Sequence, residues 1–532
     1  MENWTVEEVC SYLRQQGLEQ WVENFQAAQI TGKRLQNIVT TALEEKDPLK
    51  QCLKILHHLK MPWKSPFKEM KVFNDPVHGH IELHPLLVCI IDTPQFQRLR
   101  HIKQMGAGYF VYPGAAHNRF EHSIGVAYLA GELLKTLRER QPELDISNRD
   151  ILCVQIDMVH SHTFDGMFMP KAQPTLECKH ETLSIKMFNH MVKENKLESE
   201  MEKYDLITKE DLPFIKQSAI YLYDFTGRTA AKSFLFDIVS NKRNGIDVDK
   251  WDYLARDCYH LGIRNNFDHW RFLKFARVCQ RDGRKLICTR DKEAWNLYDM
   301  FYTRYFIHRR ACHHRVKDII ENMLVITDAF LKADAHLNIS QAVEDMDTYT
   351  KLTDHIFEEI LNSKKNELKE SRSILQKILC RKIYKCVGET PPLKTEEDTE
   401  VRLIHTGTGH VIVISLDYGK KEENPMKDMY FYRKQNPNEA ISIEQHEVSH
   451  LLPEKFFEQI VRVYCRKADN KKVQEAKMKF ENSFKEFERS QVKQSSLKEN
   501  PQALPSHFPT IPTTFHGLVP FVLVSCFSFP GS

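Results

Sequence analysis

Asp247-Val248-Asp249-Lys250-Trp251-Asp252-Tyr253 is the stretch of this 532-residue chain that says most about its fold. On a helix, Asp249, Tyr253 and Asp257 recur every four residues and form one stripe, with Lys250 one step round the axis. The stripe combines a hard oxygen donor, a phenol and a second carboxylate with an ammonium group. A solvated acidic helix face is the alternative. The interleaved Trp251 and Tyr253 disfavour it, because aromatic residues suit a cleft better than an open surface.

His117-Asn118-Arg119-Phe120-Glu121-His122 is the second informative stretch. Arg119 and His122 lie three residues apart, on one face of a predicted helix. There an imidazole can bind a metal ion while a guanidinium holds a neighbouring phosphate. An ordinary surface pair explains these two residues equally well when they are considered alone.

A third stripe contains Arg304, His308 and Cys312, again at intervals of four residues, within the basic cluster of residues 308–315. So many cations close together favour a triphosphate ligand. A zinc site at His308 and Cys312 is disfavoured, because no further thiolate or imidazole donors are grouped nearby.

The overall composition is that of a globular protein, with 42% hydrophobic residues, 28% charged residues and a formal net charge of +3. The net charge selects no partner, so clustered charge must account for any anion binding. Thirteen cysteines without a CxxC pair, and an N-terminus without a signal region, predict a reducing compartment and no disulfides. The most apolar run, residues 518–529, falls short of the ~20 residues that a membrane helix needs, so no membrane association is expected.

The chain is predicted to be mainly α, in several parts. Residues 1–60 contain a capping box at Thr5 and Glu8 and apolar residues at helical spacing, and they resemble a SAM domain, a helical interaction bundle. Residues 61–70 form a linker and residues 71–385 a large helical domain. Residues 386–485 form a small α+β lobe, with strands at 410–415 and 429–432 and a helix at 453–467. Residues 468–500 begin as a helix and then fray, and we expect a disordered tail at 486–532.

Several long strings, in order and spacing, resemble the vertebrate SAM-and-HD-domain deoxynucleoside triphosphate triphosphohydrolases. The resemblance covers about residues 1–485. It is carried by residues 71–76, 78–80, 92–100, 117–123, 241–257 and 296–300. The resemblance makes the large domain an all-α HD phosphohydrolase.

The resemblance implies a reaction in which water attacks the α-phosphorus of a dNTP and releases a deoxynucleoside and triphosphate. A divalent metal, whether Fe, Mn, Mg or Zn, polarises the phosphoryl oxygens and activates the water. His122 and Asp249 match metal ligands, and Asp165 and His180 match the pair that orients a general-acid histidine. The residues that match substrate-binding positions are Gln104, Arg119, Lys250, Tyr253, Asp257, Arg304 and His308.

The resemblance also implies activation, because family members form homotetramers when GTP or dGTP and a dNTP fill neighbouring sites. Asp92, Gln97 and Arg100 match guanine-reading residues. Thr93 before Pro94 is predicted to cap the helix that carries Gln97, Arg100 and Gln104. The other matching positions are Lys71, Val72, Asn74, His80, Arg271, Arg290, Lys292, His314 and Arg315. Lower dNTP pools, restriction of viral replication and a nuclear location follow from the same resemblance. The family's basic targeting segment is absent here, and without it the location is cytoplasmic.

The chain departs from the family pattern after Ile156, where the route to Asp165 is shorter by about two helical turns. Asp157 aligns with the Asp of the family's His-Asp pair and His160 with its general acid, whereas the His of the pair has no counterpart. Loss of a metal-binding imidazole predicts weakened or absent turnover. Two alternatives remain: a scaffold that binds nucleotides or single-stranded nucleic acid without catalysis, and an adaptor that recruits partners through its SAM domain.

Overall fold

The computed structural model describes residues 4–15, 22–27, 31, 70–157, 172, 180–220, 225–321, 325–392, 409–465 and 469–499. The chain divides into two compact units, residues 1–69 and residues 70–532. Within the described residues, no helix is both long enough and apolar enough to cross a membrane.

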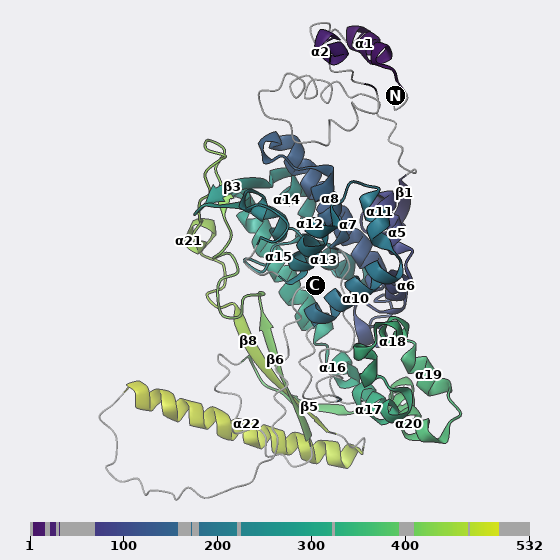
Figure 1. Ribbon diagram of the computed structural model, residues 1–532. Coiled ribbons are helices and arrows are strands. Elements are labelled where there is room, and N and C mark those ends of the chain that lie inside the picture. Colours follow the sequence, from purple (N-terminus) through teal and green to yellow (C-terminus); the bar gives the residue numbers. More distant parts are fainter. Residues whose placement is uncertain are drawn as a thin grey trace, which may run out of the picture. The chain divides into compact units, whose positions relative to one another are not determined.

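The described part of the first unit consists of helices α1 (Val6–Gln15) and α2 (Val22–Ala27) (Figure 1). The predicted capping box is confirmed, because the Thr5 amide donates to Glu8 Oε2 at 2.7 Å and the Glu8 amide donates to Thr5 Oγ1 at 3.3 Å. Leu13 and Phe25 are buried in this unit. The helical pattern at residues 49–59 lies outside the described residues.

The second unit is mainly helical, as predicted (Figure 1). Its longer helices are α7 (Arg119–Arg140), α8 (Asn148–Ile156), α10 (His180–Glu194), α12 (Thr208–Ile220), α13 (Val248–Leu261), α15 (Ala294–Ile307), α17 (Val325–Leu337), α20 (Lys369–Leu379) and α22 (Asn470–Glu499). Its shorter helices are α5 (Pro85–Ile91), α6 (Pro94–Gln97), α11 (Leu197–Glu202), α14 (His269–Phe275), α16 (Arg315–Glu321), α18 (Met346–Lys351), α19 (Ile356–Asn362) and α21 (Gln445–Val448).

Two antiparallel hairpins interrupt the segment that the sequence predicts to be all helical. The first pairs β1 (Lys71–Asp75) with β2 (Gly79–Leu83). The second pairs β3 (Arg277–Arg281) with β4 (Arg284–Arg290), and β7 (Phe431–Tyr432) adds to β4 in parallel. A chain segment beyond residue 385 therefore contributes a strand to the helical body.

The third sheet has the order β5-β8-β6, with β5 at Lys385–Glu389, β6 at Gly409–Asp417 and β8 at Phe457–Cys465. The strand predicted at 410–415 is confirmed, whereas the helix predicted at 453–467 is wrong, because most of it is β8. Residues 459–465 of β8 are buried on both faces, so their sequence does not alternate between apolar and polar residues, and periodicity cannot distinguish such a segment from a buried helix. Helix α22 continues past residue 486, into the segment predicted to be disordered.

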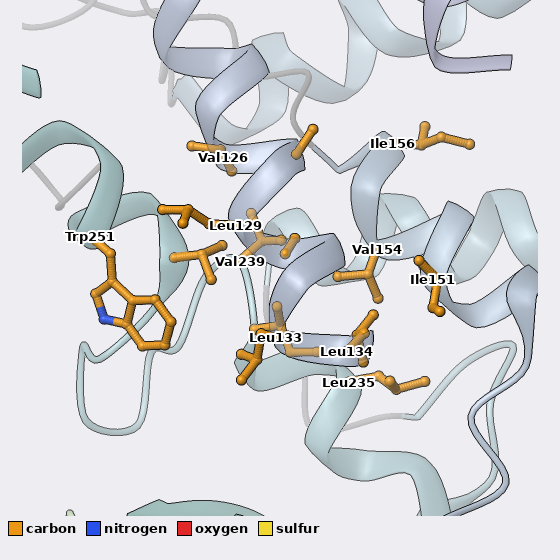
Figure 2. Packing of buried hydrophobic residues seen from close by; sticks show 14 of the residues in the cluster. Val126, Leu129, Leu133, Leu134, Ile151, Val154, Ile156, Leu235, Val239 and Trp251 are labelled. Carbon is orange, nitrogen blue, oxygen red and sulfur yellow. The ribbon is translucent and has the colours of Figure 1, made fainter. Parts of the chain in front are cut away.

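Helix α7 lies at the centre of the core. Its apolar residues face Ile151, Val154 and Ile156 of α8 on one side and Trp251 of α13 on the other, and Leu235 and Val239 belong to the same cluster (Figure 2). Gly125 permits the close approach of α7 to α13, because a Cβ at this position would lie 1.9 Å from Asp252 Oδ1. The N-terminal turn of α7 and the buried face of α13 are thereby held together.

Candidate active site

Local capping sets where the two central helices begin. The Asn118 amide donates to Glu121 Oε1 at 2.6 Å just before α7, so Arg119 and His122 fall in the first turn of that helix. The Asp247 carboxylate accepts the Lys250 amide at 3.1 Å, which starts α13 immediately before Asp249. Both sequence stretches therefore form helical turns whose functional residues are directed into the interior.

His122 is the residue that joins the two helices. Its Nε2 lies 3.1 Å from Asp249 Oδ1 and its Nδ1 lies 2.7 Å from Asp252 Oδ2. The other carboxylate oxygen of Asp252 lies 2.6 Å from His78 Nε2. Arg256 donates to both oxygens of Asp252 at 2.9 Å, and donates to Asp75 at 2.8 Å. The predicted pair of His122 and Asp249 thus belongs to a continuous buried network.

Burial and hydrogen bonding shift the pKa values of His122 and Asp252 in opposite directions. Burial lowers the pKa of His122, but the hydrogen bonds to Asp249 and Asp252 outweigh it and raise that pKa to about 9. Burial likewise raises the pKa of Asp252, but Arg256, His122 and His78 hold it well below its usual value. Asp252 is therefore a carboxylate, and it fixes the orientation of the His122 ring.

The described residues supply part of a metal site. His122 and Asp249 are adjacent, and the second carboxylate oxygen of Asp249 is buried without a hydrogen-bond partner. Within the described part of the chain, no group of three His, Cys, Asp or Glu side chains is placed to hold a metal ion. The described residues therefore do not make a complete ligand set for a metal ion.

Asp157 lies at the C-terminal end of α8 and is 3% exposed. It lines a small pocket with Ser184 and Lys216, between α8, α10 and α12. Burial, together with the charge of Asp249, raises the pKa of Asp157 to about 8. Its role as a third metal ligand stays a prediction.

The predicted phosphate-binding cations Lys250, Arg304 and Arg119 lie on α13, α15 and α7. Lys250 is 7% exposed and its Nζ lies 3.4 Å from Asp247 Oδ2. Arg304 is 3% exposed, and its Nη1 donates to Asp417. Arg119 occupies the first position of α7. The alternative of a solvated helix face is excluded for the α13 stripe, because Asp249, Tyr253 and Asp257 are all buried.

The residues expected at the sugar end are only partly grouped. Asp257 Oδ1 lies 2.6 Å from His117 Nε2, and the His117 ring stacks on His260 with ring centroids 4.3 Å apart. The backbone N–H of Gln104 donates to the backbone carbonyl of His117 at 3.0 Å. The Gln104 side-chain oxygen and the Tyr253 hydroxyl are buried without partners among the described residues. Such buried polar atoms are the groups that a ligand can satisfy.

The third predicted stripe does not keep the spacing of an α-helix. Helix α15 ends at Ile307 and continues as a π-helical turn, η7 (His308–Cys312). The wider turn rotates Cys312 away from the line through Arg304 and His308. Burial and the nearby Arg304 hold the pKa of His308 well below its usual value, so the imidazole is neutral.

The candidate activator residues lie in four places. Lys71, Val72, Asn74 and His80 are exposed on the β1–β2 hairpin, with His80 Nδ1 2.7 Å from Asn74 Oδ1. Asp92 ends α5, while Gln97 ends α6 and its Oε1 accepts from Arg100 Nε at 2.8 Å.

Thr93 caps α6 as predicted, but this helix ends at Gln97 and is followed by the 3-10 turn η2 (Arg98–His101), so Gln104 lies beyond it. Arg271 pairs with Glu293 at 2.7 Å, and Lys292 Nζ lies 4.0 Å from the centre of the Phe275 ring.

Arg290 ends β4 and pairs with Asp291 at 3.0 Å. His314 and Arg315 begin the α16 region, where Arg315 pairs with Glu389 at 3.1 Å. These activator roles stay predictions.

Two predicted catalytic residues, His160 and Asp165, lie outside the described residues. His180 begins α10, and its side chain is not described.

The sequence interpretation missed Asp252, His78 and Arg256, which build the buried network. One signal was available for Asp252, because it follows Asp249 by three residues and therefore shares its helix face. No local signal links His78 with Asp252, since 174 residues separate them.

Comparison with known proteins gives matches over most of the chain. Residues 1–60 match the model of the SAM domain (sterile alpha motif). The chain is 53% identical over 527 residues to the Danio rerio protein named deoxynucleoside triphosphate triphosphohydrolase SAMHD1, with 90% of this chain and 84% of that protein covered. Identity to the Homo sapiens protein of the same name is 48% over 535 residues, with the same coverage. Identity to the Dictyostelium discoideum homolog is 37% over 418 residues, with 75% of this chain and 78% of that protein covered.

Proposed function

Because the chain belongs to the SAMHD1 family of deoxynucleoside triphosphate triphosphohydrolases, we propose that it binds a dNTP at the α7, α13 and α15 site and hydrolyses it slowly to a deoxynucleoside and triphosphate. The observation that carries the proposal is the buried contact of 3.1 Å between His122 and Asp249. Lys250 and Arg304 lie on the helices next to this contact, α13 and α15, and both side chains are buried. A metal donor pair beside two cations is suited to a phosphate ester.

Each residue has a proposed role. Arg304 and Lys250 neutralise the triphosphate, and Arg119 assists at the N-terminus of α7, where the helix dipole also favours an anion. Tyr253 and Asp257 hold the sugar end, together with Gln104 and His308. A divalent metal, when bound, polarises phosphoryl oxygens and activates water.

Slow turnover follows from the shortened segment after Ile156. His122, Asp249 and Asp157 are the ligands that remain, and the histidine of the family's His-Asp pair has no counterpart. Removal of an outer-sphere partner of a metal already costs about 10–100-fold, so we expect at least such a loss here. His160 is the proposed general acid, with Asp165 and His180 as its orienting pair.

The activators belong to the same proposal. GTP or dGTP and a dNTP bind the charged residues on the β1–β2 hairpin, on the α5–α6 segment, on α14 with residues 290–292, and at residues 314–315, and they promote a homotetramer. The proposed cellular role is to lower dNTP pools in the nucleus.

The test measures triphosphate release from dGTP in the presence of GTP and Mg²⁺ or Mn²⁺. We expect slow release by the parent chain and none by Asp249→Ala. Glu132→Ala on the exposed side of α7 is the matched control and should behave as the parent chain does. Undiminished release by Asp249→Ala would show that the site is elsewhere.

The alternative function is a scaffold that binds nucleotides or single-stranded nucleic acid without catalysis. The observation that favours it is the incomplete ligand set among the described residues. Metal content of the purified protein separates the two functions, because the hydrolase requires stoichiometric Fe, Mn, Mg or Zn and the scaffold binds none.

A further inference from the structure

Arg304 is held in place by strand β6 of the C-terminal segment. Its Nη1 donates to the Asp417 carbonyl oxygen at 2.9 Å and to Asp417 Oδ1 at 3.0 Å. Both side chains are nearly inaccessible, with exposed fractions of 4% for Arg304 and 10% for Asp417. Asp417 therefore provides two acceptors for one nitrogen, Nη1, of the guanidinium group.

Asp417 is itself fixed by the turn that follows β6. Its Oδ1 accepts the Gly419 amide at 2.8 Å and its Oδ2 accepts the Lys421 amide at 3.1 Å. Gly419 adopts a φ of +95°, which brings this turn against Arg304, since a Cβ there would lie 3.8 Å from Arg304 Cζ. The carboxylate is thus oriented before it meets the guanidinium group.

Tyr305 and Tyr418, which follow Arg304 and Asp417 in the sequence, are also in contact. The Tyr418 ring stacks on the Tyr305 ring with centroids 5.5 Å apart and an interplanar angle of 12°. The Tyr305 hydroxyl also donates to Glu458 Oε1 on β8 at 3.0 Å. The end of β6 is therefore seated firmly on α15, and the pair of Arg304 and Asp417 is part of that interface.

Arg304 keeps a hydrogen-bond donor, its Nε, that Asp417 does not use. Its Nε is buried without a hydrogen-bond partner among the described residues, as is the hydroxyl of Tyr253. The charge of Arg304 acts on both Tyr253 and His308, which places it among the proposed substrate residues. A buried donor without a partner is unfavourable, and an anionic ligand would provide the missing acceptor.

We propose that Asp417 is a positioning residue, which holds the Arg304 guanidinium so that its free edge meets the phosphates of the substrate. The inference rests on the proposed function, because the anion assigned to Arg304 is the dNTP triphosphate. A prearranged guanidinium loses less freedom on binding, so the site gains affinity from the C-terminal strand. The opposite role, in which Asp417 competes with phosphate for Arg304, predicts the reverse sign.

The test is equilibrium binding of dGTP to the full chain in the presence of saturating GTP, which occupies the guanine-reading activator site, and turnover is not used as a readout. We expect Asp417→Ala to weaken dGTP binding about 10-fold, as expected when a preorganised contact is lost. Asp417→Asn should stay within about 3-fold of the parent, because its amide oxygen still accepts from Arg304. Glu423→Ala, an exposed change in the same turn region, is the matched control and should bind as the parent does.

A double-mutant cycle separates positioning from a general effect on structure. In an Arg304→Ala background, Asp417→Ala should cause no further loss of dGTP affinity. Equal or tighter binding by Asp417→Ala overturns the inference, and so does a loss that persists without Arg304. If Asp417→Ala fails to fold, the pair of Asp417→Asn and Asp417→Ser gives the same comparison, with loss expected only for serine. A parent chain that binds no dGTP contradicts the proposed function and the role of Asp417 together, whereas a binding parent with an unaffected Asp417→Ala contradicts the latter alone.

Discussion

At the scale of single residues, Asp252 decides how the buried polar groups of the body are arranged. It accepts hydrogen bonds from Arg256 and contacts the rings of His78 and His122. Arg256 has no exposed side-chain surface, so Asp252 and Asp75, and not water, compensate its positive charge. Paired charges of this kind are tolerated in a protein interior because every partner is present.

Asp252→Asn should therefore lower the free energy of unfolding by about 3 kcal/mol, since loss of one partner leaves a buried charge incompletely compensated. The measurement is urea unfolding of the chelator-treated protein. Glu132→Gln, which breaks an exposed pair with Lys135, is the control and should change stability by less than about 1 kcal/mol. A variant as stable as the parent would mean that the network contributes little.

At the scale of elements, α7 shows where helix propensity gives way to packing. Gly125 lies inside this helix, where alanine is normally favoured by about 1 kcal/mol. A Cβ at Gly125 would also lie 2.6 Å from Arg256 Nη2, in addition to its clash with Asp252. Neither side chain can move without breaking the buried network.

Gly125→Ala should consequently destabilise the protein by about 1–3 kcal/mol, the usual cost of overpacking. Thermal unfolding measures the effect. Lys135→Ala, at an exposed position of the same helix, should be nearly neutral and controls for the added alanine. Stabilisation by Gly125→Ala would show that α7 and α13 can separate at no cost.

Helix α5 carries a pH-dependent cap. The His84 Nδ1 accepts the Leu86 amide at 3.2 Å, which requires the neutral ring, and burial lowers the pKa of His84 to about 4. Because the folded pKa lies below the unfolded value, the contribution of the cap is complete above about pH 6.5 and is lost as the pH falls towards 4.

His84→Ser should remove this pH dependence, because serine caps a helix without titrating. The parent should lose about 1 kcal/mol more than the variant between pH 6.5 and 4, a figure reduced for the partial exposure of the ring. Urea unfolding at a series of pH values measures it. His446→Ser, at an exposed histidine, should keep the pH dependence of the parent.

The helices and strands differ in how well their sequences predict them. The stripes on α7 and α13 were predictable, since a 3.6-residue period places Arg119 with His122 and Asp249 with Tyr253 wherever the helices pack. Strand β8 was not, because a short run buried on both faces has no period of its own. The pair of Arg304 and Asp417 spans 113 residues, and no local pattern encodes a contact of that range.

At the scale of the whole molecule, the C-terminal strands belong to the body that contains the candidate site. Strand β7 extends the β3–β4 hairpin in parallel, and the end of β6 holds Arg304. Arg462 on β8 adds a buried ion pair with Asp318 on α16, at 2.8 Å. Three contacts of different kinds thus connect residues beyond 409 with the helical body, and one of them, between Asp417 and Arg304, reaches a helix of the candidate site.

Residues 1–69 form the other compact unit, with a core of their own that includes Leu13 and Phe25. A chain of residues 70–532 should therefore fold, and its main calorimetric transition should stay within about 4 °C of the parent midpoint, a shift that corresponds to about 4 kcal/mol or less at an unfolding entropy of about 2 cal/mol/K per residue. Its affinity for dGTP should also match that of the parent, because every proposed substrate residue lies beyond residue 70. The matched control removes residues 409–532, which should abolish cooperative unfolding since β7, β6 and Arg462 are lost together. Loss of the transition in the 70–532 chain would instead show that the second unit depends on residues 1–69 for its stability.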